Sequence, residues 1–345
     1  MSVSKSEIVE MLRARGDAQA QLFHEARRQR AAAHGDGALL RGVVEVTNLC
    51  RVNCDYCPMR KDNTPANSIF VLDEDQIMAR ARAVHAAGID VVFLQAGEIP
   101  KTTGIVGRVI PRIRELFDDR VEILLNLGGK KRSEYAYLKD QGATSYILKH
   151  ETANPELHAE LRYESLADRL KYMEDLLDLG YKVGTGAIVG LPGQRLDDLA
   201  DDILLAQRLG VHMASVAPFV PAPRTPLENH PHGDVDVALN MIAAMRLVRP
   251  DWLIPSVSAL EKTRPGGQVQ GFQAGANVMT INFSDAKHTD RYLIYGKDRF
   301  VVRSAHAAET LSRAGLTAMG SPFVAARSAG RLGDARQAPA TSELA

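Results

Sequence analysis

Three cysteines are the residues most able to do chemistry in this chain. Cys50, Cys54 and Cys57 are its only cysteines, and they lie within eight residues in the spacing C-x3-C-x2-C. Thiolates bind soft metal centres such as zinc, cuprous copper and iron–sulfur clusters. A loop can wrap three such closely spaced thiolates around one point, whereas a strand or a regular helix cannot. The spacing therefore predicts a metal-binding loop.

The missing fourth ligand indicates what kind of centre this is. A structural zinc site takes four protein ligands, but no fourth Cys exists, and the next His, His85, falls inside a predicted helix. Three protein ligands leave one coordination position open, which is typical of a reactive site.

Composition excludes several classes of function. The 345 residues include 42 basic and 42 acidic side chains, so the formal net charge of zero indicates no nucleic-acid partner. No apolar run approaches the length of a membrane span, and residues 1–30 lack the apolar core of a signal peptide. Three clustered cysteines without partners elsewhere argue against a disulfide framework. We therefore expect a soluble, cytoplasmic protein without a membrane partner.

Apolar runs and helical patterns alternate along the chain. A helix is predicted over 4–34 and is followed by eight strand candidates: 42–47, 91–95, 121–125, 144–148, 182–189, 213–217, 253–256 and 277–281. The helix candidates are 73–87, 105–117, 133–141, 166–179, 196–209, 235–248, a weak one near Val269, and 305–314. The strand candidates are nearly continuous apolar runs, as expected for strands covered on both faces.

Eight units in series predict an α/β fold, a complete (β/α)8 TIM-type barrel, with an open doubly wound sheet as the alternative. We expect one domain over residues 1–320, with the barrel at about 42–315. The segment 321–345, rich in Ala, Arg, Gly, Ser and Pro, is predicted to be a disordered tail.

Polar residues follow the predicted strands, where barrel enzymes place their chemistry. After the second strand come Gly97, which lets a ligand approach the backbone, and Glu98, a carboxylate able to bind an ammonium group. After the fourth comes Glu151, and the next helix carries Arg169; these two form either a structural ion pair or a ligand clamp. We interpret His150 as a packed, hydrogen-bonded histidine.

The cysteine spacing, with aromatic Tyr56 before the last Cys, resembles that of the radical S-adenosylmethionine (SAM) superfamily. The resemblance implies that Cys50, Cys54 and Cys57 hold a [4Fe–4S] cluster and that SAM chelates its fourth iron. Reductive cleavage of SAM then gives a 5′-deoxyadenosyl radical that acts on a small substrate. The remaining residues that the resemblance assigns to cofactor binding are Tyr56, Gly97, Glu98, Glu151, Arg169, Ile188 and Phe219.

Within that superfamily, several segments resemble the HydE-type maturases of [FeFe]-hydrogenase, a group that includes biotin synthase and methylornithine synthase. These segments are 50–57, 60–63, 95–100, 150–155, 189–194, 218–221, 265–267 and 275–279. Pro58, Gly128-Gly129, Lys149 and the segment 257–262 depart from the maturase pattern, mostly where substrate contacts are expected. A HydE-like enzyme with a different small substrate is therefore a possibility.

No cysteine remains for a second cluster, which argues against sulfur insertion of the biotin-synthase kind. The expected partners are a small-molecule substrate and a one-electron donor such as ferredoxin or flavodoxin. Three alternatives remain open: an amino-acid mutase of the methylornithine-synthase type, a non-catalytic cluster carrier, and a zinc-dependent lyase or hydrolase. Beyond the cluster and the SAM site, the sequence predicts no catalytic residue.

Overall fold

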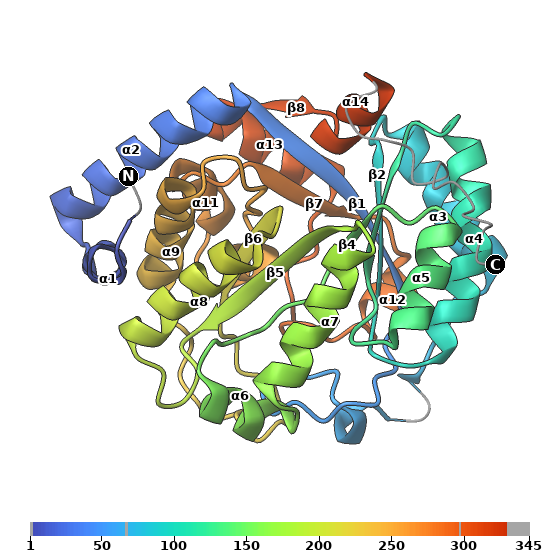
Figure 1. The fold of residues 1–345 in the computed structure, drawn as a ribbon, viewed down its shortest axis with the longest axis horizontal. Helices are drawn as coiled ribbons and strands as arrows, with labels where there is room; N and C mark the ends of the chain where they lie inside the picture. Colours follow the sequence, from blue (N-terminus) through green and yellow to red (C-terminus); the bar gives the residue numbers. More distant parts are fainter. Residues whose placement is uncertain (1–2, 66–67, 297, 330–345) are drawn as a thin grey trace, which may run out of the picture.

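Parallel strands and outer helices alternate along the chain (Figure 1). The computed structural model describes residues 3–65, 68–296 and 298–329. The strands are β1 (Gly37–Thr47), β2 (Val91–Ala96), β3 (Glu122–Asn126), β4 (Ser145–Ile147), β5 (Lys182–Val189), β6 (Met213–Pro218), β7 (Val278–Asn282) and β8 (Thr317–Met319). Seven of the eight predicted strands are confirmed, and β8 was not predicted.

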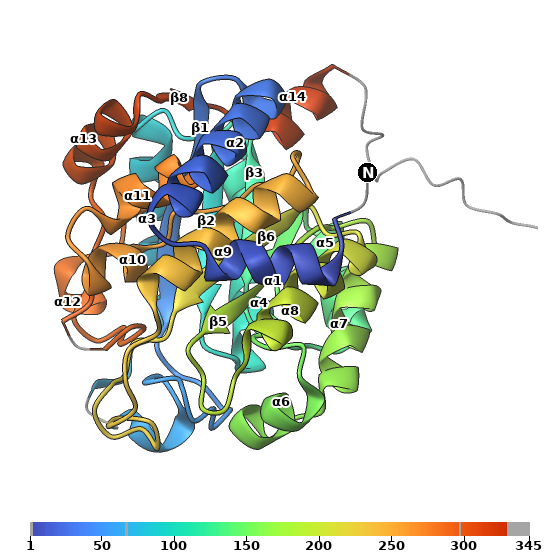
Figure 2. The ribbon, with the colours of Figure 1, turned by 90° about the vertical axis from the view of Figure 1, so that its left-hand side faces the viewer.

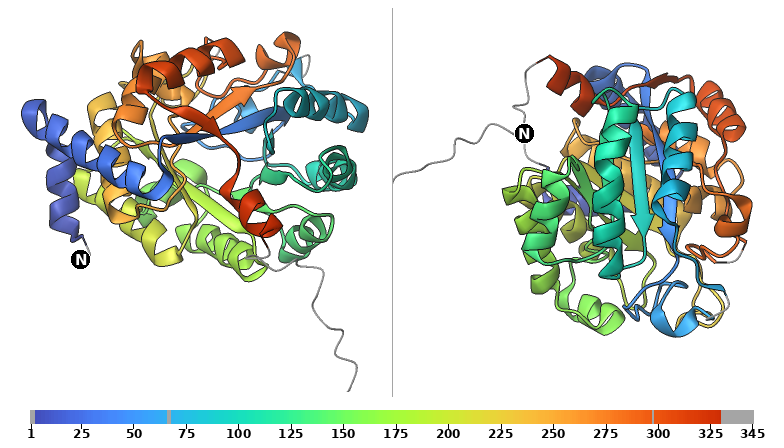
Figure 3. Two further views of the ribbon diagram at one scale, coloured as in Figure 1. Left: turned by 90° about the horizontal axis from the view of Figure 1, so that it is seen from above. Right: turned by 90° about the vertical axis from the view of Figure 1, so that its right-hand side faces the viewer.

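The sheet is parallel throughout, in the order β6-β5-β4-β3-β2-β1-β7, and β8 pairs with the start of β1. The order follows the sequence except at β7, which lies beside β1 (Leu39 opposite Val278). This curved sheet with helices on its outer face is a TIM-like half-barrel (Figure 3).

The predicted strand at 253–256 is wrong as a regular strand. This segment makes two isolated parallel bridges, Leu253 to Met213 of β6 and Pro255 to Val278 of β7. Proline has no amide hydrogen to donate to a ladder, so pairing stops after one bridge on each side.

Helices cover the outside of the sheet. They are α1 (Lys5–Arg13), α2 (Gly16–His34), the 3-10 turn η1 (Lys61–Asn63), α3 (Glu74–Ala86), α4 (Lys101–Leu116), α5 (Arg132–Asp140), α6 (Pro155–Arg162), α7 (Leu166–Asp178), α8 (Leu196–Leu209), α9 (Val235–Val248), α10 (Ser258–Thr263), α11 (Gly267–Gln273), α12 (Ala286–Thr289), α13 (Ser304–Ala314) and α14 (Pro322–Ser328). None of the helices in the described part of the chain has both the length and the apolar character needed to cross a bilayer.

The N-terminal segment predicted as one helix over 4–34 is two helices that meet at an angle (Figure 2). α1 starts at a capping box formed by Ser4 and Glu7 and ends at Ala14, whose backbone is extended. The Asn240 amide of α9 donates to the carbonyls of Leu12 and Ala14, at 3.1 and 2.8 Å. The chain bends here because a buried side chain satisfies the carbonyls that a continuous helix would have used.

The C-terminal tail is ordered further than the sequence predicted. Disorder from Ser321 onward is wrong for α14, which Ser321 caps. The Ser321 hydroxyl donates to the buried Glu122 carboxylate, and its amide donates to Asp90 at 2.9 Å. Seen from above, β8 and α14 lie across the amino ends of the strands (Figure 3, left). The rest of the predicted tail, residues 330–345, lies outside the described residues.

We expect Asn240→Ala to destabilise the fold. The variant removes two hydrogen bonds to the Leu12 and Ala14 carbonyls, which keep only their bonds from Arg15 Nη1. The loss of a hydrogen bond costs about 0.5–1.5 kcal/mol. Chemical denaturation followed by circular dichroism measures the change, and Asn229→Ala, at an exposed position, is the matched control. Equal stability of the two variants would contradict the role assigned to Asn240.

Candidate active site

The cysteine loop follows β1 and has no regular secondary structure. Cys54 is buried, Cys50 and Cys57 are half-buried, and all three are free thiols. A tight turn brings the Cys57 amide to 3.2 Å from the Cys54 carbonyl. Burial raises the pKa of all three thiols, and the neighbouring thiol charges raise that of Cys57 further. Three thiolates in such a place need a cationic partner, which an iron–sulfur cluster supplies.

The thiols are not arranged around a single ion. Among the described residues, no three Cys, His, Asp or Glu side chains converge as ligands of one metal ion would. Ligands that each bind a different iron of a cluster do not need to converge in this way. Thiolates are the ligands that iron–sulfur clusters take, so these three residues fit a cluster by their chemistry.

Gly97 lets β2 approach the cysteine loop. Its amide donates to the Thr47 carbonyl at 3.2 Å, and the Arg51 amide donates to the Glu98 carbonyl at 3.0 Å. A Cβ at position 97 would lie 2.2 Å from the Leu49 carbonyl oxygen and 3.0 Å from the Cys50 Cβ. Only glycine allows this contact without displacing the loop.

Glu98 lies beside that contact with its carboxylate held on two sides. Its Oε2 accepts from the Gly129 amide at 2.8 Å, and its Oε1 accepts from Arg51 Nη2 at 3.0 Å. Gly128 has φ of +76°, and a Cβ there would lie 2.3 Å from the Glu98 Cγ. The turn after β3 therefore packs directly against the Glu98 side chain.

Arg169 is buried in the same place and does not form an ion pair with Glu151. Its Nε donates to the Lys149 carbonyl at 2.8 Å, which fixes the guanidinium at the end of β4. Its Nη1 lies 3.6 Å from Glu98 Oε2 and 3.8 Å from Glu164 Oε2, but it makes no hydrogen bond. A buried donor without a hydrogen bond is costly, so this atom can donate to a bound anion. Of the two alternatives for Glu151 and Arg169, the geometry favours a ligand clamp over a structural ion pair.

Glu151 is held by its backbone. Its φ is +66°, its amide donates to the Gly186 carbonyl, and its carbonyl accepts from Ile188, at 2.9 and 3.0 Å. This left-handed conformation, uncommon outside glycine, persists where the surrounding structure fixes it. Glu151 and Arg169 both line one cavity, together with Tyr56, Cys57 and Ile188.

The apolar side of the site joins Tyr56, Ile188 and Phe219. These three residues belong to one cluster with leucines of α6 and of the loop after β5. The Gln194 amide stiffens that loop, because it donates to the Ile188 carbonyl at 2.8 Å and accepts from the Gly190 amide at 2.8 Å. The structure thus brings together all the residues predicted from sequence.

Sequence reasoning missed Arg162. It is buried at the end of α6, donates to the Tyr56 hydroxyl at 2.8 Å and lies 3.9 Å from Glu98 Oε2. Glu164 at 3.2 Å partly balances its charge. The missing signal was α6 itself, since an eight-residue helix was not predicted there. The only cue in the sequence was a pair of arginines seven positions apart, Arg162 and Arg169.

His150 is a structural residue, as predicted. It is buried, its Nδ1 lies 2.8 Å from the Thr185 hydroxyl, and its Nε2 lies 3.2 Å from an Asp202 oxygen. Its ring nitrogens are therefore occupied within the fold, away from the cavity lining.

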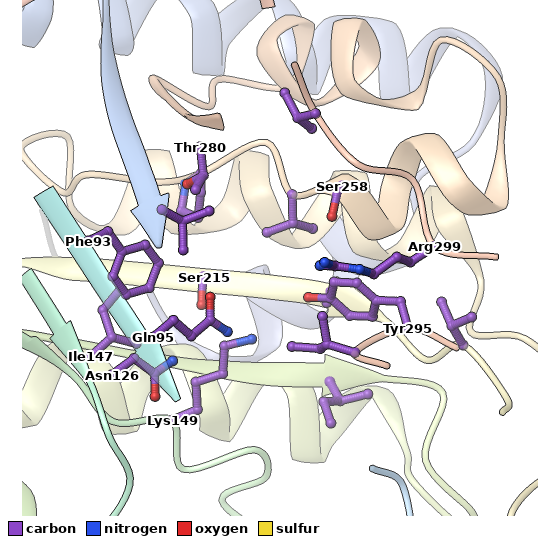
Figure 4. A pocket seen from close by; sticks show the side chains of 18 of the residues that line it. Phe93, Gln95, Asn126, Ile147, Lys149, Ser215, Ser258, Thr280, Tyr295 and Arg299 are labelled. Carbon is purple, nitrogen blue, oxygen red and sulfur yellow. The ribbon is translucent and has the colours of Figure 1, made fainter. Parts of the chain in front are cut away.

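The cavity continues into the interior of the sheet, with a volume of about 290 Å³. Figure 4 shows Gln95, Asn126, Lys149 and Tyr295 pointing into it from separate elements. Burial alone would lower the pKa of Lys149, but the neighbouring Tyr295, Glu151 and Cys57 raise it, so Lys149 stays a cation. On the opposite wall, Arg299 is paired with Glu45 at 2.7 Å.

Comparisons with known proteins agree with this geometry. The model described as the radical SAM superfamily matches residues 44–206. The [FeFe] hydrogenase maturase subunit HydE of Thermotoga maritima is 37% identical over 263 residues, which cover 76% of this chain and 74% of HydE. The biotin synthase of Thermotoga neapolitana is 25% identical over 68% of this chain and 85% of its own length. The crystal structure of methylornithine synthase superposes with a TM-score of 0.81 at 21% identity, covering 92% of this chain and 95% of that one.

We expect Gly128→Ala to weaken SAM binding to the reconstituted protein by about tenfold, or about 1.4 kcal/mol. The added Cβ would displace the Glu98 side chain. Equilibrium dialysis under anaerobic conditions measures the affinity.

Gly315→Ala is the matched control. Gly315 has a similar φ of +69°, but a Cβ there meets no atom within 4 Å. The control therefore carries the same backbone strain without touching the site. If both variants bind SAM as the natural protein does, Gly128 does not position Glu98.

Proposed function

This chain belongs to the radical SAM superfamily, whose members bind a [4Fe–4S] cluster and S-adenosylmethionine, and we propose a HydE-like reaction on a small anionic substrate held inside the sheet. The observation that carries the proposal is that one cavity is lined by Cys57 of the cysteine loop, by Arg169, whose Nη1 makes no hydrogen bond, and by Lys149.

In this proposal the three thiolates hold the cluster and the surrounding groups hold SAM. Glu98 receives the ammonium group of SAM, and Arg169 receives its carboxylate through Nη1, the donor that makes no hydrogen bond within the protein. Glu151 faces the ribose, while Tyr56, Ile188 and Phe219 form an apolar wall for the adenine. When bound, the cluster supplies the electron that cleaves SAM to a 5′-deoxyadenosyl radical.

The positive charge of Lys149 favours an anionic substrate. Its ammonium group has no acid paired with it among the described residues, and Gln95 and Asn126 point into the cavity beside it. Arg299 is less available, because the Glu45 carboxylate at 2.7 Å already balances its charge. A carboxylate on Lys149, with amide contacts from Gln95 and Asn126, would orient a small acid against the SAM side of the cavity.

We also propose that the barrel is complete and that residues 1–320 act as one domain. The two bridges of the 253–256 segment link β6 to β7, so this segment takes the place of the missing strand of the barrel. A closed wall at this point would exclude water from the cavity while a reactive radical is present.

The HydE-like proposal is favoured over the amino-acid mutase. Besides a cation for the carboxylate, a mutase needs a free acid inside the barrel for the substrate's α-ammonium group. Of the two acids that line the cavity, Glu45 is paired with Arg299 and Glu151 lies on the proposed SAM side.

The first test is whether the protein cleaves SAM. After anaerobic reconstitution with iron and sulfide, dithionite and SAM should yield 5′-deoxyadenosine, detected by mass spectrometry. Cys54→Ala should lose both the visible iron–sulfur absorbance and the product while keeping its circular dichroism spectrum, because thiolate ligation holds the cluster. A fully loaded protein that forms no 5′-deoxyadenosine, with or without cell extract, would refute the proposed function.

The second test concerns substrate charge. A small thiol acid such as L-cysteine should stimulate 5′-deoxyadenosine formation more than cysteamine, which lacks the carboxylate. Lys149→Gln should remove most of that difference, because the charged contact is worth about 1.5–3 kcal/mol.

Lys171→Gln, at an exposed lysine of α7, serves as control for the loss of one positive charge. Equal responses of the natural protein to the acid and the amine, across a panel of such pairs, would count against an anionic substrate.

A further inference from the structure

A second hollow lies on the outside of the molecule, next to the cysteine loop. It has a volume of about 300 Å³ and is lined by residues from three segments: Pro58, Asn63, Pro65 and Ser68 after the cysteines, the loop after β6, and the segment after α12. Figure 2 shows these segments at the same end of the molecule, where the strands terminate. We call it the outer groove.

Pro58 separates the outer groove from the interior cavity. It lines both hollows and directly follows Cys57. The Asn63 amide fixes this thin wall, because it donates to the Pro58 carbonyl at 2.8 Å and to the Pro223 carbonyl at 3.3 Å. A molecule seated in the outer groove would therefore lie one residue away from a proposed cluster ligand.

The rim of the outer groove carries unpaired positive charge. Arg224 and Arg291 are both exposed, and neither side chain has an ion-pair or hydrogen-bond partner in the described part of the chain. Asp290 is the acid that lines the groove, and Glu228 and Asp62 lie in the adjoining segments. The Glu228 carboxylate accepts from the Arg224 amide at 2.7 Å, and the Asp62 carboxylate accepts from the Asn53 side-chain amide at 2.5 Å. Leu293, in the same segment as Arg291, adds apolar surface to the groove.

The other side of the cysteine loop, next to α6, carries negative charge. There the Asp55 amide donates to the Leu161 carbonyl of α6 at 2.9 Å, so α6 covers that side. The exposed acids of α6, Glu156 and Glu160, have no cation partner among the described residues. An acidic protein would be repelled from the α6 side and attracted to the outer groove.

We propose that the outer groove docks an acidic one-electron carrier protein that reduces the cluster. This rests on the proposed function, which needs an electron delivered to the cysteine loop. One electron leaves the reduced cofactor of the carrier and enters the oxidised cluster, and no proton or atom is transferred. Pro58, which lines both hollows, would lie between the two centres.

The test measures binding first, so that it does not depend on turnover. Purified flavodoxin, an acidic carrier, is titrated with the chain at low ionic strength and followed by its flavin fluorescence. Arg224→Glu/Arg291→Glu should raise the dissociation constant by about tenfold or more, and added salt should weaken binding to the natural protein. Arg82→Glu/Arg120→Glu, which reverses two exposed charges at the other end of the strands, should bind as the natural protein does.

Turnover then separates docking from chemistry. With flavodoxin as donor, the groove variant should form 5′-deoxyadenosine several-fold more slowly than the natural protein, whereas with dithionite the two should agree within twofold. Unchanged flavodoxin binding in the groove variant overturns the docking proposal even if SAM cleavage proceeds. Loss with dithionite as well also overturns it, since the arginines would then act on the site itself. If the natural protein makes no product with dithionite, the proposed function fails, and the binding result still decides the groove.

Discussion

The close contact of Gly97 with the Leu49 carbonyl is the constraint on which the rest of the site depends. It presses the end of β2 against the start of the cysteine loop, with 2.2 Å between that oxygen and the position a Cβ would take. The next residue, Glu98, is thereby placed between the loop and the turn after β3. Gly128 acts in the same way on the other side of Glu98. Because Gly128 has no side chain, the Glu98 side chain can fill the space beside it. Two glycines that follow neighbouring strands thus hold one carboxylate in place.

Around this carboxylate the site collects more positive than negative charge. Arg51, Arg162 and Arg169 all lie within 4 Å of Glu98, while Glu164 is the other acid that Arg162 and Arg169 contact. Burying cations without full compensation is unfavourable unless an anion completes the arrangement. Three thiolates and the carboxylate of a bound ligand would supply that charge. The excess of arginine and the raised thiol pKa values therefore both indicate that the protein alone does not balance the charges of this site.

The sequence predicted those features that depend on local pattern. The alternation of apolar runs and helices predicted seven of the eight strands in the sheet, and the cysteine spacing predicted the loop after β1. It failed where distant parts of the chain decide the structure. The break between α1 and α2 depends on Asn240, more than 200 residues away, and the order of α14 depends on Glu122 and Asp90. Arg162 was missed because α6 is short, and the predicted strand at 253–256 fails because Pro255 cannot donate to a ladder of hydrogen bonds.

Pro58 links the inner and outer surfaces of the cysteine loop. Proline has a fixed φ and no amide hydrogen, so a loop that ends in Cys57-Pro58 is stiffer than one with another residue after the last cysteine. Asn63 binds the Pro58 carbonyl and so removes the remaining freedom of this segment. A stiff wall has two consequences: it keeps the third thiol at a constant depth in the cavity, and it keeps the outer groove at a constant distance from that thiol. Lys149, which departs from the maturase pattern, lines only the interior cavity. Pro58 also departs from that pattern, but it lines both the interior cavity and the outer groove.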